Sequence, residues 1–205
     1  MVSRMPSMHE LDLLALLATY GGADGSWRRT MLAFTILGSG WSALGIVPLI
    51  FWSRTRRFAE ALAVAIVAQA TWTWTLKRVV ARTRPWIALG YPAPFGAPHD
   101  GSFPSGHASG SFCVAAFLVV TLPAAWRQAE GSGSPSSPRR ARLVAAAAVA
   151  IAFLVGLSRV YLGAHFPSDV LAGALMGSCF GVAAGRLHLA RQRASGGRAA
   201  VALRD

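Results

Sequence analysis

The sequence predicts an all-α membrane protein, a polytopic bundle of five to six transmembrane helices. Of its 205 residues, 54% are hydrophobic and only 14% are charged, and the mean hydropathy is +0.45. The apolar residues fall in long runs, and the arginines gather in short clusters between those runs. A soluble domain of this size has fewer apolar residues and does not arrange them in such blocks.

Five apolar segments come close to the roughly 20 residues that a helix needs to cross the hydrocarbon core. They are residues 30–52, 58–76, 106–125, 143–160 and 168–190. A sixth apolar element, residues 8–20, follows a Ser7-x-x-Glu10 capping box and precedes Gly21-Gly22, a helix stop. At ~1.5 Å per residue this element reaches only about 20 Å, so we expect it to lie at the membrane surface.

The arginine clusters predict the orientation of the chain. With strict alternation of the segments, the clusters at 54–57, 127–142 and 191–198 fall on one side of the membrane. Positive charge collects on the cytoplasmic side, so the loop near 77–105 and the turn at 161–167 are expected to face away from the cytoplasm. The expected location is therefore the cell (plasma) inner membrane, with the site on its extracytoplasmic side. The net charge of +12 does not indicate nucleic acid binding, because the basic residues form no continuous stripe.

These segments divide the chain into three parts. Residues 1–29 form an N-terminal segment with the short interfacial helix, residues 30–190 form the membrane domain, and residues 191–205 form a cytoplasmic basic tail.

The last apolar segment carries a stripe of small residues. Glycines recur every four positions, at Gly173, Gly177, Gly181 and Gly185. Such a stripe lets two helices approach closely, within one chain or between two chains. Asp169 lies in the same register, so we expect it to face the bundle, where an intramembrane carboxylate indicates a functional site.

Three polar stretches at segment ends converge on the predicted extracytoplasmic face, namely residues 77–85, 104–107 and 158–169. Lys77, Arg84 and Arg159 supply the positive charge that a phosphate dianion requires. Arginine offers bidentate geometry, and lysine offers a point charge. Arg78 and Arg82 lie in the first stretch as well, and we interpret them as surface or lipid-headgroup contacts.

The second stretch, Pro104-Ser105-Gly106-His107, opens an apolar segment. A helix N-terminus presents free backbone N–H groups and a favourable dipole to an anion. Gly106 allows close approach, and the Ser105 hydroxyl can donate to a phosphate oxygen. A simple serine cap is the alternative interpretation of these residues.

Two histidines are expected to lie on the same face as these charged residues. His165 lies four residues before Asp169, a spacing that can place imidazole beside carboxylate. The carboxylate would hold one ring nitrogen and leave the other free to attack. His107 would donate a proton to the leaving oxygen and later activate water. No role is assigned to His9, His99 and His188.

Together these stretches resemble the signature of the type 2 phosphatidic acid phosphatase superfamily, which also includes vanadium haloperoxidases and bacterial acid phosphatases. The matching motifs are Lys-x6-Arg-Pro (Lys77, Arg84, Pro85), Pro-Ser-Gly-His (104–107) and Ser-Arg-x5-His-x3-Asp (158–169). Every motif position is present, in the family's order. Membrane members often have six spans, whereas this chain has five plus the short element at 8–20.

The resemblance implies a helical fold and hydrolysis of a phosphomonoester or diphosphate without metal or other cofactor. By it, His165 is the nucleophile, Asp169 orients it and His107 is the general acid. It assigns phosphate binding to Lys77, Arg84, Ser105, Gly106 and Arg159.

A membrane phosphatase with an extracytoplasmic site favours undecaprenyl diphosphate as substrate. Phosphatidic acid and phosphatidylglycerol phosphate are close alternatives, and so is phosphate transfer to another lipid, which needs the same first half-reaction. A haloperoxidase is disfavoured because the chain is short and membrane-embedded. A non-enzymatic lipid-binding protein is disfavoured because both histidines and Asp169 are present. The oligomeric state stays open.

Overall fold

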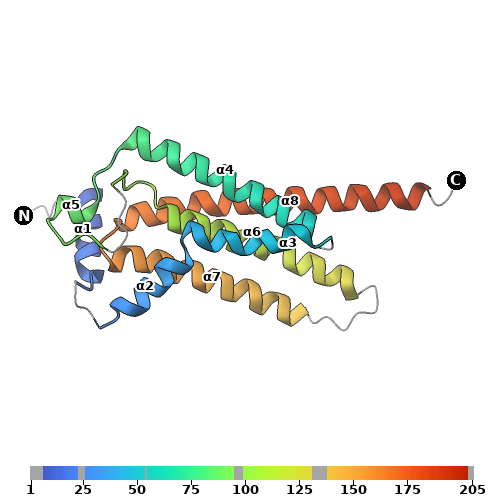
Figure 1. Cartoon of the computed structure of the whole chain (residues 1–205), viewed down its shortest axis with the longest axis horizontal. Coiled ribbons are helices and arrows are strands. Elements are labelled where there is room, and N and C mark those ends of the chain that lie inside the picture. The colour runs from blue at the N-terminus through green and yellow to red at the C-terminus, as the bar shows by residue number, and fades with distance from the viewer. Residues whose placement is uncertain (1–6, 23–25, 54, 95–98, 131–137, 203–205) are drawn as a thin grey trace, which may run out of the picture.

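The computed structural model describes residues 7–22, 26–53, 55–94, 99–130 and 138–202, and within these ranges every regular element is a helix (Figure 1). This confirms the predicted all-α bundle. The elements are α1 (Met8–Thr19), α2 (Arg28–Leu37), the 3₁₀-helix η1 (Gly40–Ile46), α3 (Val47–Phe51), α4 (Arg56–Val80), α5 (Pro85–Ala88), α6 (Gly106–Glu130), α7 (Pro138–Tyr161) and α8 (Pro167–Ala202).

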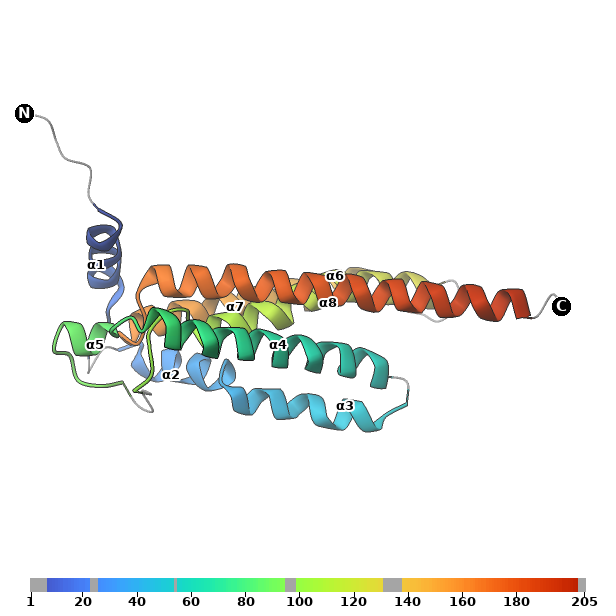
Figure 2. The ribbon, with the colours of Figure 1, turned by 90° about the horizontal axis from the view of Figure 1, so that it is seen from above.

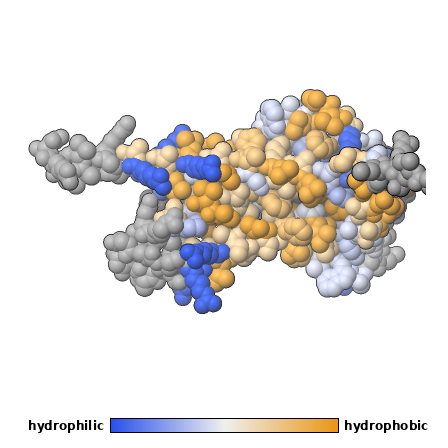
Figure 3. Space-filling view, turned by 180° about the vertical axis from the view of Figure 1, so that it is seen from behind, coloured by the Kyte–Doolittle hydropathy of each residue, from blue (hydrophilic) through white to orange (hydrophobic). Residues whose placement is uncertain are grey.

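Three helices of the described chain are long and apolar enough to cross a membrane. The qualifying stretches are Gly106–Ala124, Arg139–Tyr161 and Pro167–Ser195. Their outward side chains are those that lipid tolerates, such as Phe153, Leu171 and Leu175, each exposed by 65% or more. Apolar surface fills the middle of the molecule between its two ends (Figure 3). Helix α4 is long enough at 25 residues, but Gln69 and several threonines make it more polar.

The first predicted span, residues 30–52, is wrong as a single continuous helix. The chain starts this passage at Arg28, ends α2 at Gly38, continues as η1 and then forms α3. Glycine and serine at 38–40 are weak helix formers, and Gly38 also lies so close to α7 that a Cβ there would be 2.3 Å from Val155 Cγ1. Irregular backbone at this depth is tolerated where it lines a cavity within the protein.

The glycine stripe of α8 packs against α6 in the same chain, which resolves the choice between an internal and an intermolecular contact. A Cβ at Gly173 would lie 2.5 Å from the carbonyl oxygen of Ser105, and one at Gly177 would lie 2.0 Å from that of Ser109. Only glycine permits this approach. The register also brings Asp169 into the interior as predicted, and its side chain is fully buried.

The loops that carry the predicted motifs meet at one end of the bundle, and the arginine-rich starts of α4 and α7 lie at the other (Figure 1). Helix α1 lies across the motif end, roughly perpendicular to the long helices in both views (Figure 2). Its predicted capping box is present, with Ser7 N donating to Glu10 Oε2 over 2.6 Å. Leu16 of α1 packs with Val160 and Phe166, so the helix covers the turn between α7 and α8.

Candidate active site

His165 lies in the short loop between α7 and α8, and its two ring nitrogens have different surroundings. Nδ1 lies 3.6 Å from Asp169 Oδ2, whereas Nε2 lies 3.2 Å from Arg84 Nη1. The side chain is 2% exposed. Burial lowers the pKa of His165 to about 3, against the opposing effect of Asp169, with Arg159 and Arg84 adding to the decrease. The imidazole is therefore neutral at neutral pH, with Nε2 directed toward the cationic side of the site.

Asp169 fixes this arrangement from the first turn of α8. Its Oδ2 accepts the backbone N–H of Phe166 over 2.9 Å and the hydroxyl of Ser102, and its Oδ1 accepts Arg82 Nη1 over 2.7 Å. The Asp169 carboxylate thus ties Phe166 of the loop to the first turn of α8 while it faces His165. A buried charge is stable only with such a full set of donors.

Two of the predicted cations share one carboxylate. Asp100 Oδ1 accepts Arg84 Nη2 over 2.6 Å, and its Oδ2 lies 3.0 Å from Lys77 Nζ. Arg84 also donates to the carbonyl oxygen of Ala164, over 3.0 Å, beside the histidine. Burial alone would raise the pKa of the Asp100 carboxyl, but the hydrogen bonds from Arg84 and Lys77 outweigh it and hold the pKa below 3.8.

Arg159, the third cation, reaches the site from the end of α7. It is 4% exposed, and its Nη1 donates to Thr35 Oγ1 of α2 over 3.1 Å. Its Nε is buried and has no partner among the described residues. A buried guanidinium N–H without an acceptor is costly, and a bound anion would remove that cost.

The N-terminus of α6 completes the ring of predicted residues. Ser105 is buried, and its Oγ accepts the N–H of Ala108 over 3.4 Å, so it does cap the helix. A Cβ added at Gly106 would make only an ordinary van der Waals contact, with Thr73 Cγ2 at 3.6 Å. His107 is half-buried, and the positive charges that act on it come from Arg159, Arg84 and Lys77. All eight predicted site residues therefore gather at one end of the bundle.

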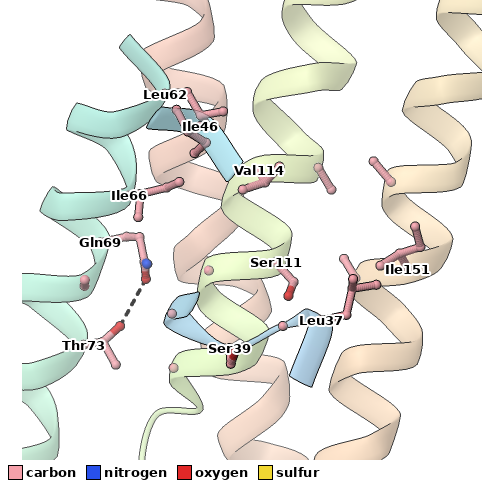
Figure 4. Close-up of a pocket in the computed structure, with 18 of the residues that line it drawn as sticks. Leu37, Ser39, Ile46, Leu62, Ile66, Gln69, Thr73, Ser111, Val114 and Ile151 are labelled. Carbon is pink, nitrogen blue, oxygen red and sulfur yellow. Dashed lines mark hydrogen bonds between the residues drawn. The ribbon is translucent and has the colours of Figure 1, made fainter. Parts of the chain in front are cut away.

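A cavity of about 660 Å³ runs from this ring into the bundle between α4, α6, α7 and the η1 passage (Figure 4). Lys77 and Gly106 line it near the site, and apolar residues such as Ile66, Val114 and Ile151 line it further in. Gln69, Thr73 and Ser111 are polar residues of this lining, and Gln69 Oε1 accepts Ser109 Oγ over 2.6 Å. The site is thus polar at the bundle end and continuous with an apolar space.

The interpretation of Arg82 as a surface contact is wrong. Its guanidinium bridges Asp169 Oδ1 and Asp12 Oδ2 of α1, at 2.7 and 2.8 Å. Arg78, by contrast, is exposed and stacks over Trp74 at 3.6 Å. Sequence reasoning also missed the contributions of Ser102, Asp100 and Thr35.

One signal pointed to Arg82: the Arg-x-Arg spacing of 82–84, which in an extended segment places both side chains on one side. Ser102, Asp100 and Thr35 carried no comparable signal. They come from an irregular loop and from the broken first span, where no period connects them to the motifs.

Comparison with known families and proteins gives consistent matches. The family model described as PAP2 superfamily matches residues 57–193, from the start of α4 into α8. The chain is 39% identical to phosphatidylglycerophosphatase B of Bacillus subtilis (strain 168) over 50% of this chain and 44% of that protein. It is 32% identical to an undecaprenyl-diphosphatase of Sulfolobus acidocaldarius over 67% of this chain and 58% of that protein. The chain thus spans about half the length of these two relatives.

Two further similarities cover more of both molecules. A decaprenylphosphoryl-5-phosphoribose phosphatase of Mycolicibacterium smegmatis is 31% identical over 84% of each chain. Among solved structures, a transmembrane PAP2 type phosphatidylglycerolphosphate phosphatase from Bacillus subtilis superimposes with a TM-score of 0.71 at 26% identity, over 87% of this chain and 85% of that one.

Proposed function

Because the chain belongs to the PAP2 superfamily, we propose that it is an integral-membrane lipid phosphatase that acts through a phosphohistidine at His165. The observation that carries the proposal is the placement of the two imidazole nitrogens: Nδ1 faces Asp169 and Nε2 faces Arg84. A neutral histidine with one nitrogen held by a carboxylate and the other beside a cation is arranged to attack phosphorus. The names of the relatives, all phosphatases, support the same reaction class.

The reaction proceeds in two halves. His165 Nε2 forms a bond to phosphorus, the bond from phosphorus to the lipid oxygen breaks, and that oxygen takes a proton from His107. Water then attacks phosphorus and gives a proton to His107, while the nitrogen–phosphorus bond breaks and its electron pair returns to Nε2. Asp169 stabilises the positive charge of the substituted ring in between.

Phosphate binding is the role of the surrounding cations and of the α6 N-terminus. Arg84 and Arg159 supply planar donors, and the unpartnered Nε of Arg159 is one that a phosphate oxygen would satisfy. Lys77 adds a point charge, and the backbone N–H groups at Ser105 and Gly106 add a helix terminus. Stabilisation of charge on the transferring group provides most of the rate enhancement in such reactions.

The cavity supports a lipid as the substrate. Its volume of about 660 Å³ and its apolar walls fit part of a lipid tail, while the phosphate stays at the polar end. Undecaprenyl diphosphate is our preferred substrate, supported by two relatives named for polyprenyl phosphates. Phosphatidic acid and phosphatidylglycerol phosphate are the alternatives, the latter supported by the similar Bacillus subtilis structure, and transfer to another lipid acceptor is the third.

The proposed location is the inner membrane, with the site facing away from the cytoplasm. The arginines at the starts of α4 and α7 lie at the end opposite to His165, in agreement with positive charge on the cytoplasmic side. The proposed phosphatase domain is residues 30–190, between the N-terminal segment 1–29 and the basic tail 191–205.

Phosphate release by the purified protein in detergent tests this function. We expect release from a panel of prenyl and glycerolipid phosphates, inhibition by vanadate and no inhibition by EDTA. His165→Ala should abolish turnover, whereas His99→Ala, which alters a histidine beside Trp86, serves as the matched control. Alkaline quenching with ³²P-labelled substrate should trap a label on wild-type protein that His165→Ala lacks. Full turnover in His165→Ala would refute the mechanism.

A further inference from the structure

Asp12 is a buried carboxylate on α1, outside the stretch that matches the family. The match begins at residue 57, so α1 is not part of it. Asp12 is 7% exposed, whereas Glu10, the other acidic residue of α1, lies on the exposed side of the same helix. Buried acids require strong partners, so the contacts of Asp12 indicate what it does.

Both carboxylate oxygens of Asp12 are directed at the elements that carry the site. Oδ1 accepts the backbone N–H of Ser168 over 2.8 Å, and Oδ2 accepts the Ser168 hydroxyl and Arg82 Nη2, the latter over 2.8 Å. Ser168 is the second residue of α8 and precedes Asp169. Asp12 therefore satisfies a free N–H of the α8 N-terminus from another helix.

Arg82 connects this contact to the nucleophile. While Nη2 donates to Asp12, Nη1 donates to Asp169 Oδ1 and to Ser168 Oγ, each over 2.7 Å. The other oxygen of Asp169 faces His165 Nδ1. A continuous series of contacts thus runs from Asp12 through Arg82 and Asp169 to the imidazole.

The charges along this series explain why Asp12 affects the site. Arg82 carries one positive charge between two carboxylates. If Asp12 were neutral, Arg82 would be balanced by Asp169 alone, and Asp169 would stabilise a positively charged His165 less well. Arg82 would also lose one of the two carboxylate contacts that hold its guanidinium in place. In the structure the guanidinium lies over the Phe166 ring, with Cζ 4.1 Å from the ring centroid.

Helix α1 is fixed to the same loop at two further points. Leu16 is fully buried against Val160 and Phe166, and Gly21 N donates to the carbonyl oxygen of Tyr161 over 3.0 Å. These contacts hold Asp12 at a fixed distance from Arg82. A side chain that acts through another side chain requires such a fixed separation.

We propose that Asp12 is a positioning residue for the phosphohistidine step: it holds and neutralises Arg82 so that Asp169 keeps both its orientation and its charge toward His165. The inference rests on the proposed phosphatase function and adds α1 to the machinery of that site.

The experiment is a double-mutant cycle on the full-length protein in detergent, with phosphate release as the readout. Asp12→Asn should lower kcat about tenfold with KM changed less than about twofold, because orientation at the nucleophile is lost while phosphate contacts remain. In an Arg82→Gln background the same substitution should lower kcat by less than about twofold, because its effect is transmitted through Arg82. Asp12→Glu should restore most of kcat, since the carboxylate is retained.

The matched control is Glu10→Gln. It removes one negative charge from the same helix and preserves the capping box, which accepts either residue, so kcat should equal that of the wild type. Should Asp12→Asn not yield folded protein, Arg82→Lys replaces it in the comparison. Lysine keeps the charge but cannot hold two carboxylates as a fork, so kcat should fall to the same extent.

The outcomes are distinct. Wild-type kcat in Asp12→Asn or Arg82→Lys, or equal losses in both backgrounds of the cycle, would overturn the role of Asp12 and leave the phosphatase function intact. A wild-type protein that releases no phosphate from any lipid of the panel would overturn both proposals together.

Discussion

The two walls of the cavity differ in how tightly they are built. On one side, α6 lines the cavity and α8 packs behind it so closely that only glycine fits. This contact holds Ser105 and Asp169 together, with Ser105 N donating to the Asp169 carbonyl oxygen over 2.9 Å. On the other side, the end of α2 and η1 line the cavity as a broken passage, in which a Cβ added at Gly40 or Gly45 would meet no described atom within 4 Å.

One bundle thus meets two opposite requirements. The proposed in-line attack on phosphorus tolerates little displacement, and the elements that carry His165 and Asp169 are locked by backbone contact. A lipid tail has many conformations and needs only apolar volume, so the facing wall can be irregular. Three substitutions test this contrast.

Gly177→Val should abolish the folded protein. A Cβ at Gly177 would lie 2.0 Å from the Ser109 carbonyl oxygen, a backbone atom that cannot move without shifting α6. Overpacking costs about 1–3 kcal/mol even where side chains can adjust, and here they cannot. Size-exclusion chromatography and thermal unfolding in detergent measure the result. Gly45→Val on the irregular wall is the control and should retain a monodisperse peak, and equal behaviour of the two variants would contradict the contrast between the walls.

The tight wall was predictable from the sequence, and the irregular wall was not. A four-residue glycine period in an apolar segment predicts close packing and fixes the face on which Asp169 lies. The three motifs likewise predicted all eight residues that gather at the site, because each motif adjoins a helix end whose side of the membrane follows from counting spans.

Residues 30–52 were mispredicted because apolarity determines only that a segment is buried in lipid, not that its backbone is regular. Thr35 reaches Arg159 from α2, which ends at Leu37 and packs on α7. Arg82 was mispredicted for a related reason. Its partner Asp12 is 70 residues away on a helix that looks like a surface element, and no local pattern predicts an ion pair over that separation.

Gln69→Leu should raise KM about fivefold with little change in kcat, the size expected from one lost polar contact of about 1 kcal/mol. Gln69 is 4% exposed and connects α4 to the tight wall, since its Oε1 accepts Ser109 Oγ of α6 and Thr73 Oγ1 of its own helix. Its loss should loosen the cavity below the phosphate without touching His165. Steady-state kinetics on one prenyl diphosphate measures it, with Thr71→Val on the exposed face of α4 as control. A fall in kcat at constant KM would indicate instead that Gln69 acts on the tight wall, which carries Ser105 and Asp169.

Asp100→Asn should have the smallest effect and should be visible mainly in the pH dependence of stability. Asp100 lies in the loop before the tight wall, 48% exposed, and its ion pairs with Lys77 and Arg84 hold its pKa below 3.8 in the folded protein. A carboxyl whose folded pKa is depressed stabilises the protein above its unfolded pKa, and this contribution disappears as the pH falls through the folded value.

The melting temperature of the wild type should therefore decrease more steeply than that of Asp100→Asn as the pH falls below about 4. Above that pH the variant should melt slightly lower than the wild type. Glu60→Gln, which removes an exposed ion pair with Arg56 at the far end of α4, controls for general charge effects. Parallel melting curves of wild type and Asp100→Asn across this pH range would mean that the Asp100 carboxylate is solvated like any surface acid. The ordered contacts beside the tight wall would then extend only as far as Ser102.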